Sequence, residues 1–202
     1  MKIGPKYKIA RRLGAPVFEK TQTQKFALSE SRKRRPFGRP QQVSDYGLQL
    51  KEKQKARYSY ALTEKVFGRM VRNAMKQTAA KPADALFETL ERRLDATVTR
   101  SGLGPTRLFC RQLISHGHIL VNGRRVTIPS YTVSTGDVIQ VKPSSVEKGL
   151  FQNSAQNESS SSAPSWLVVD DKQKTITITG MPVKDEVDLL FDTNSVLEFY
   201  SR

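Results

Sequence analysis

Arginines at helical spacing are the residues of this chain best suited to bind an anion. They lie in the run T-R-L-F-C-R-Q-L-I-S-H-G-H-I-L-V-N-G, from Thr106 to Gly123. Arg107, Arg111 and Ser115 are four residues apart, so a helix would place them in one stripe. Guanidinium groups match the geometry of phosphate oxygens, which makes phosphate the ligand that this stripe predicts. The apolar residues of the same helix fall on another face, which we expect to pack on a core: Phe109, Cys110, Leu113 and Ile114.

Strand signals follow this helix. Residues 118–121 and 124–126 flank Asn122-Gly123, a pair that supplies the positive φ angles of a two-residue hairpin turn. Residues 133–141 add further strand pieces, so the stretch from about 91 to 141 predicts a small α+β module. Further side chains would extend the polyanion-binding surface of the module: Asn122, Arg124 and Arg125 on the hairpin and Arg100 on the preceding helix.

The chain has two histidines, His116 and His118, and one cysteine, Cys110. No third ligand of the usual type lies near the histidines, so we expect no metal site. A single cysteine excludes an internal disulfide and a cysteine-based zinc cluster. His116, at the end of the helix, is either a C-terminal cap or a hydrogen-bond donor to RNA. Cys110 is expected in the core, and no cofactor is predicted.

Net charge points to the same kind of partner. The chain has 34 Lys and Arg against 19 Asp and Glu, a net charge of +15 and a pI near 10.1. The net charge is +12 over residues 1–60, +7 over 61–142 and −4 over 143–202. A chain this basic favours a polyanionic partner, most simply a nucleic acid. Its acidic last third is expected to face solvent or a basic protein.

Length and motifs limit the class of protein. A chain of 202 residues can bury a core and hold one or two domains. It has no apolar run of about 18 residues and no apolar signal-peptide segment, so we expect a soluble cytoplasmic protein without membrane contact. It also lacks a Walker loop, a zinc signature and a Ser–His–Asp set, so we expect neither an enzyme nor a small-molecule substrate.

Residues 1–43 combine basic side chains with interleaved aromatics and prolines, and no helical or strand period persists there. We expect an extended arm that orders on its partner, and a solvated tail is the alternative. Residues 152–165 are polar and of low complexity, which predicts a flexible loop.

A helix is predicted from Ser44, as its N-cap, to about Gln77, with a bend near Gly68. Tyr60, Thr63, Phe67, Met70, Val71 and Ala74 would fall on one side of it. Four cations would form the opposite side: Lys65, Arg69, Arg72 and Lys76. A face exposed only for solubility would usually mix charges, so we favour a helix face that follows phosphates.

A second helix is predicted after Pro82, with an apolar face that runs from Leu86 to Val98. Arg93 lies at the edge of that face. Two interpretations stay open for it: an ion pair with a carboxylate such as Asp95 or Glu91, or contact with RNA. Near the C-terminus, residues 166–169 and 175–178 predict a strand pair, and Asn194 a final helix cap.

Longer motifs are shared with a known family. They include S-D-Y-G-L-Q-L-K-E-K-Q-K-A-R from Ser44, L-E-R-R-L-D from Leu90 and E-F-Y-S-R from Glu198. With the Thr106–Gly123 run they follow one another in the family's order over nearly the full length. The chain therefore resembles the bacterial and organellar family of small-subunit ribosomal protein S-four.

The resemblance implies a fold and partners. It implies an α+β protein with an extended basic N-terminal arm (1–43), a helical domain (44–89, completed by 186–202) and an inserted small α+β RNA-binding module of two helices plus hairpin and strands (90–185). It also implies binding to the five-prime domain of small-subunit rRNA early in assembly. The implied neighbours are proteins S-three and S-five and the region where mRNA enters, with a part in decoding accuracy.

Some relatives bind zinc or an iron–sulfur cluster through N-terminal cysteines, which this chain lacks. Other proteins with the same module leave two alternatives open: a stand-alone RNA chaperone and, more weakly, a basic DNA-binding protein. We expect RNA contact from these side chains: Lys6, Lys8, Arg11, Arg12, Arg32, Lys33, Arg34, Arg35, Lys51, Lys53, Lys55, Arg57, Lys65, Arg69, Arg72, Lys76, Arg93, Arg100, Arg107, Arg111, Ser115, His116, Asn122, Arg124 and Arg125.

Overall fold

The computed structural model describes residues 3–31, 44–77, 81–146, 163–170 and 173–202. These residues form helices and one antiparallel sheet, whose strands do not follow their order in the chain. The predicted α+β class is therefore confirmed. The chain divides into two compact units, Met1–Ala83 with Leu189–Arg202 and Asp84–Asp188. The finer division predicted from the sequence, at residues 43, 89 and 185, stays a prediction.

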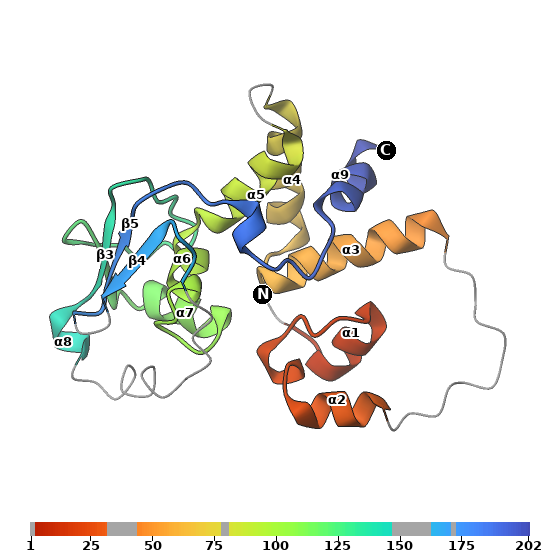
Figure 1. Cartoon of the computed structure of the whole chain (residues 1–202), viewed down its shortest axis with the longest axis horizontal. Helices are drawn as coiled ribbons and strands as arrows, with labels where there is room; N and C mark the ends of the chain where they lie inside the picture. The colour runs from red at the N-terminus through yellow and green to blue at the C-terminus, as the bar shows by residue number, and fades with distance from the viewer. Residues whose placement is uncertain (1–2, 32–43, 78–80, 147–162, 171–172) are drawn as a thin grey trace. The chain divides into compact units, whose positions relative to one another are not determined.

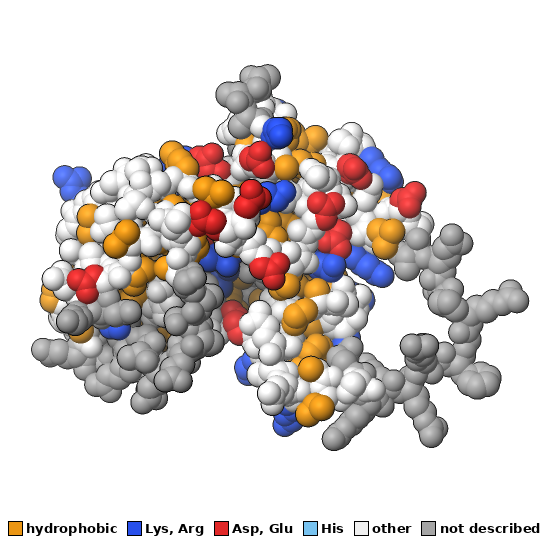
Figure 2. Space-filling model, in the orientation of Figure 1, with side chains coloured by type: hydrophobic (Ala, Val, Ile, Leu, Met, Phe, Trp, Pro, Cys, Tyr) orange, Lys and Arg blue, Asp and Glu red, His pale blue; other side chains and the backbone are white. Residues whose placement is uncertain are grey.

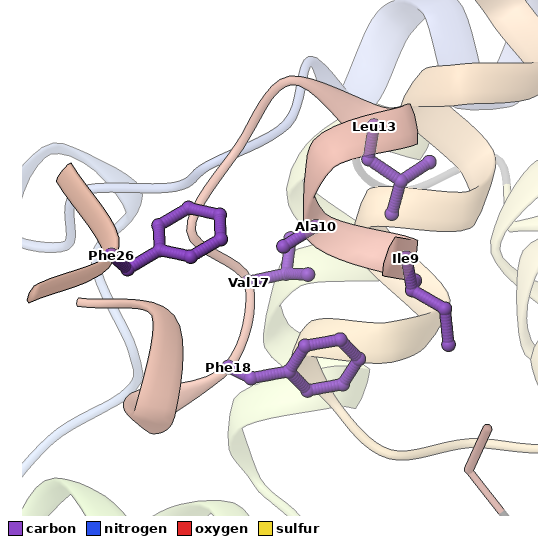
Figure 3. Packing of buried hydrophobic residues seen from close by; sticks show 6 residues of the cluster. All are labelled: Ile9, Ala10, Leu13, Val17, Phe18 and Phe26. Atoms are coloured by element: carbon purple, nitrogen blue, oxygen red, sulfur yellow. The ribbon is translucent and has the colours of Figure 1, made fainter. Parts of the chain in front are cut away.

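The N-terminal segment has a core of its own. It forms α1 (Lys6–Leu13), the 3-10 helix η1 (Glu19–Thr21) and α2 (Gln24–Ser31). Figure 3 shows the side chains that gather between these elements: Ile9, Ala10, Leu13, Val17, Phe18 and Phe26. Phe18 also meets Tyr58 edge-on, with ring centroids 5.7 Å apart.

The prediction of an extended arm is therefore wrong for residues 3–31. Two helices of eight residues each are too short to show a persistent period. Isolated helices of that length are marginal in water, so packing stabilises them. Of the predicted flexible loop 152–165, residues 152–162 lie outside the described residues.

Two helices replace the single one predicted from Ser44. They are α3 (Asp45–Ser59) and α4 (Glu64–Lys76). The Ser44 hydroxyl accepts a hydrogen bond from the Gly47 amide, which confirms the predicted N-cap. The break lies at residues 60–63, where Ala61 has a φ of 49°, and α4 continues without interruption through Gly68.

The C-terminal helix α9 (Thr193–Ser201) lies beside α3 in the first unit (Figure 1). Its N-cap is Asp192, whose carboxylate accepts from the amides of Asn194 and Ser195, and not the predicted Asn194. Tyr200 donates a hydrogen bond of 2.7 Å to the Glu64 carboxylate, and the same carboxylate accepts from Lys53 at 2.9 Å. One carboxylate therefore ties three helices together.

The second unit begins with α5 (Pro82–Glu91), α6 (Leu94–Arg100) and α7 (Arg107–Ser115). The helix predicted from Pro82 to Val98 is interrupted at Arg92 and Arg93, because Arg93 forms a β-bridge with Thr132. Thr106 caps α7 through its hydroxyl, which accepts from the Phe109 amide, as expected for a threonine that directly precedes a helix.

The sheet of the second unit has the strand order β2-β1-β3-β5-β4, with every neighbouring pair antiparallel. Its strands are β1 (Ile119–Val121), β2 (Arg124–Arg125), β3 (Val138–Val141), β4 (Leu167–Asp170) and β5 (Thr175–Ile178). The Asn122-Gly123 turn has the predicted positive φ angles, 50° and 75°. Short helices α8 (Pro143–Val146) and η3 (Lys184–Glu186) follow β3 and β5.

Loss of the Glu64 charge is expected to loosen α9. Burial alone raises the pKa of Glu64, but hydrogen bonds from Tyr200 and Lys53 and the charges of Lys53 and Arg57 outweigh it, so the pKa lies below its ordinary value. A carboxyl with a lowered folded-state pKa stabilises the fold above its ordinary pKa, and this contribution disappears as pH falls through the folded-state value. We expect the melting temperature of Glu64→Gln to fall less steeply than that of the native chain as the pH is lowered. Circular dichroism would measure the melting temperatures.

Glu88→Gln is the control, since Glu88 forms an ordinary helix-surface pair with Arg92. Tyr200→Phe should cost about 1 kcal/mol at neutral pH, because one hydrogen bond to a half-exposed charge is lost. An acid limb that is unchanged in Glu64→Gln would show that this carboxylate does not hold α9.

Candidate nucleic-acid interface

Helix α4 carries an open basic surface. Phe67, Val71 and Ala74 are buried, as the helical spacing predicted. The opposite face consists of four exposed cations that form no ion pair within the described part of the chain: Lys65, Arg69, Arg72 and Lys76. With no acidic partner to satisfy them, these side chains are available for phosphate.

Helix α3 differs, because its cations are used inside the protein. Lys53 is 7% exposed, donates to Glu64 and lies 4.4 Å from the centre of the Phe199 ring. Lys55 pairs with Glu52 at 2.6 Å, and Arg57 lies 3.8 Å from the second Glu64 oxygen. Lys53 therefore has a structural role within the protein, which does not favour RNA contact by its side chain. Lys51, Lys55 and Arg57 keep part of their surface.

Helix α7 has the two faces that its sequence predicted. Cys110, Leu113 and Ile114 are buried, and burial raises the pKa of the Cys110 thiol to about 11. Arg107 and Arg111 are partly exposed on the other face, and Ser115 is exposed. The hydroxyl of Ser115 donates to the carbonyl of Arg111, so its proton is used within the helix.

A buried carboxylate stands behind this arginine face. Asp95 is 1% exposed and accepts from Arg93 with both oxygens, at 3.0 and 2.7 Å. The same carboxylate lies 3.8 Å from the guanidinium of Arg111. Arg93 is thus the closer partner of Asp95, and Arg111 lies next to this carboxylate with a partly exposed side chain.

The structure thus decides between the two interpretations of Arg93. Its side chain is nearly inaccessible and forms the predicted ion pair with Asp95, which does not favour RNA contact by Arg93. Arg100 is held in a similar way, with two hydrogen bonds to the buried carboxylate of Glu91 at 3.1 and 2.8 Å. Arg100 retains a partly exposed edge.

The hairpin adds two exposed arginines, Arg124 and Arg125. Arg125 crosses over Gly117 and donates to the carbonyl of His116 at 3.2 Å. A Cβ at Gly117 would lie 2.0 Å from the guanidinium, so glycine is required for this close approach. The arginine is therefore fixed against the end of α7, beside the exposed His116.

Asn122 holds the hairpin together. Its amide nitrogen donates to Asp137 at 2.8 Å, and its amide oxygen accepts from the Val138 amide at 2.9 Å. These hydrogen bonds use both the nitrogen and the oxygen of the side-chain amide, so the main role of Asn122 is structural. His118 pairs with the Ser145 hydroxyl at 2.9 Å. Nowhere in the described ranges do three His, Cys, Asp or Glu residues gather as metal ligands would.

The N-terminal segment contributes Lys8 and Arg12, which are exposed, and Lys6 and Arg11, which are partly exposed. Arg32, Lys33, Arg34 and Arg35 lie outside the described residues. Figure 2 shows Asp and Glu side chains interspersed with Lys and Arg on the face drawn there. Net charge alone therefore does not define the interface, and the pairing of each cation has to be considered.

Known proteins match the chain over its full length. The family model of the ribosomal protein S4/S9 N-terminal domain matches residues 1–91, and that of the S4 domain matches residues 92–139. The chain is 41% identical to the small ribosomal subunit protein uS4 of Roseiflexus castenholzii, over 99% of this chain and 98% of the relative. The chain belongs to the uS4 family. The uS4 protein of Chlorobium phaeovibrioides is 38% identical over 96% of each chain.

Membership of the uS4 family has direct consequences. The chain is a structural constituent of the small ribosomal subunit with an S4 RNA-binding domain, and it is not an enzyme. The place of such a protein is the ribosome, in the cytoplasm. Separately, none of the helices that the structure describes is both long and apolar enough to cross a bilayer. The family resemblance inferred from the motifs is confirmed.

Sequence reasoning named Asp95 as a partner for Arg93 but missed the groups that support the other arginines. Glu91 binds Arg100, Asp95 also lies near Arg111, and Gly117 makes room for Arg125. A weak signal existed, because a carboxylate on an otherwise apolar helix face needs a cation. The close approach of Arg125 to Gly117 depends on how the hairpin packs on the end of α7, which the sequence pattern does not give.

Removing Arg93 is expected to destabilise the second unit. Arg93→Ala leaves the buried Asp95 charge without its main partner, at a cost of about 3–5 kcal/mol. Arg124→Ala removes an exposed arginine of the same unit and should change stability by less than about 0.5 kcal/mol. Urea unfolding followed by the fluorescence of Trp166, the single tryptophan, reports on this unit. Equal midpoints for the two variants would contradict a buried ion pair at Arg93.

Proposed function

We propose that this uS4-family chain binds the five-prime domain of small-subunit rRNA, at a junction of several RNA helices, early in subunit assembly. There it lies near the region where mRNA enters, beside proteins S-three and S-five. Its contact with S-five contributes to decoding accuracy. The observation that carries the rRNA proposal is the unpaired basic face of α4, together with the family of the chain.

The mechanism follows from where the cations lie. Junctions of RNA helices bring phosphates together, and the self-repulsion of these phosphates opposes a compact arrangement. Lys65, Arg69, Arg72 and Lys76 follow one another along three turns of α4, which suits a single backbone track. Neutralising such a track lowers the repulsion and favours one arrangement of the junction. Double-stranded RNA is recognised mainly through shape and backbone, for which this surface needs no base-specific side chains.

The S4 domain supplies a second, more rigid surface. Arg111 is supported by Asp95 and Arg125 by the end of α7, so less side-chain freedom is lost when phosphate binds. Arg107, Arg124 and His116 extend this surface with partly or fully exposed side chains. A rigid arginine surface favours a defined RNA shape over any exposed strand.

The acidic last third supports protein neighbours rather than RNA. Residues 143–202 carry a net charge of −4, and Asp185, Glu186 and Asp188 are exposed. Glu186 also accepts from the amide and hydroxyl of Ser165, hydrogen bonds that lower its pKa and keep it ionised. A negative surface repels phosphate and attracts basic proteins. This charge is consistent with contacts to ribosomal neighbours such as S-five.

The test of the function is equilibrium binding of the purified full chain to the five-prime domain of small-subunit rRNA, over a range of salt concentrations and with excess tRNA. We expect binding that survives the tRNA competitor, because the junction presents a shape that tRNA lacks. Binding that tRNA abolishes would contradict the proposal and favour the RNA-chaperone alternative. Equal binding to duplex DNA would favour the DNA-binding alternative.

The α4 face is tested by removing two of its charges. Lys65→Gln with Arg69→Gln should lower the slope of log affinity against log salt by about 1.5, at about 0.7–0.9 per phosphate contact. Lys142→Gln with Lys184→Gln removes the same charge outside the predicted interface and should leave the slope nearly unchanged. Equal slopes in the two double variants would remove α4 from the interface.

A further inference from the structure

Tyr7 is an exposed aromatic residue held on a fixed support. It lies on α1, and its ring stacks on that of Phe26 from α2, with centroids 5.5 Å apart and planes 25° from parallel. Phe26 is 9% exposed and belongs to the core of the N-terminal segment (Figure 3). Tyr7 is 44% exposed although one of its faces is covered. Part of the Tyr7 side chain is therefore open to a ligand.

One cation lies on the same side of α1 as this ring. Arg11 is one helical turn beyond Tyr7, whereas the Lys6 ammonium lies 5.7 Å from the centre of the Phe18 ring. The guanidinium of Arg11 lies 5.8 Å from the Phe26 ring centre and donates to the Ser29 hydroxyl at 2.8 Å. Phe26 therefore supports one face of the Tyr7 ring, and the positive charge of Arg11 lies next to this pair of rings.

We propose that the outer face of Tyr7 is a stacking site for an unpaired nucleobase of the bound RNA, with Lys8, Arg11 and Arg12 on the flanking phosphates. The proposal rests on the proposed function and adds a base-binding subsite to it. An aromatic ring beside cations is the arrangement by which proteins hold single-stranded nucleotides. Stacking accepts any base, so the site reads an unpaired nucleotide rather than a sequence.

Charge favours a nucleotide over an apolar protein side chain at this position. Tyr46 in the same unit is similarly placed, 51% exposed and with its ring 5.5 Å from that of Phe199. The two ring planes at Tyr46 are tilted by 34°, Phe199 is only partly buried, and the Lys53 ammonium beside Phe199 is already bound to Glu64. Tyr7 differs in its buried support, Phe26, and in the partly exposed Arg11 beside that support.

The experiment compares Tyr7→Leu, Tyr7→Phe and the matched control Tyr46→Leu in the full chain, bound to the five-prime domain across salt concentrations. Loss of a stacked base is expected to weaken binding about fivefold or more in Tyr7→Leu. The salt slope should stay unchanged, because no phosphate contact is removed. Tyr7→Phe keeps the ring and should bind like the native chain, and Tyr46→Leu should do the same.

Cross-linking gives a direct readout. With 4-thiouridine in the RNA, mass spectrometry should find a cross-link at Tyr7 that is lost in Tyr7→Leu. Native affinity in Tyr7→Leu would overturn the inference and leave the proposed function intact. Weaker binding by Tyr7→Leu that is accompanied by lost helix content would also overturn the inference. So would a loss of affinity that appears only when neighbouring small-subunit proteins are present. Failure of the native chain itself to bind the five-prime domain would instead contradict the proposed function.

Discussion

Buried carboxylates that hold arginines are the interaction on which the rest of this structure depends. Glu91 and Asp95 are almost inaccessible, and each is bound by both arms of a guanidinium. An uncompensated charge in such a place would cost several kcal/mol, so the pairs must form when the unit folds. The Glu91–Arg100 pair joins α5 to α6, the Asp95–Arg93 pair holds the start of α6, and Asp95 also lies near Arg111 on α7. The framework of the second unit and the orientation of its arginine surface therefore have the same origin.

In the first unit, a single carboxylate pairs with cations from within the protein. Glu64 accepts from Tyr200 and Lys53 and lies close to Arg57, which brings α9, α3 and the start of α4 together. A chain with so much positive charge repels itself, and each internal pair removes part of that repulsion. The pairs also sort the cations into two groups. Those of α3 stabilise the protein, and those of α4 stay open to a polyanion.

This sorting explains how a protein of high net charge can have a defined interface. If every Lys and Arg were free, any polyanion would bind almost anywhere, with little preference for shape. Fixed arginines such as Arg111 and Arg125 lose less freedom on binding than mobile ones, which favours one RNA geometry. The small core of residues 3–31 acts similarly, since Phe26 fixes the ring of Tyr7. Rigid support of polar and aromatic groups is thus the common feature of both units.

The sequence by itself determined the features that depend on near neighbours. The Thr106 cap, the α7 stripe, the Asn122-Gly123 hairpin and the basic face of α4 all follow from periods and turns of a few residues, and the motifs identified the family. Only the tertiary structure decided that Lys53 and Arg93 are structural, that residues 3–31 pack into a core, and that breaks fall at residues 60–63 and at Arg93. Lys53 binds Glu64 eleven positions away and lies against Phe199 of the C-terminal helix, and Arg93 forms a β-bridge with Thr132 that ends α5. Such partners meet only after the chain has folded, so no local pattern contains them.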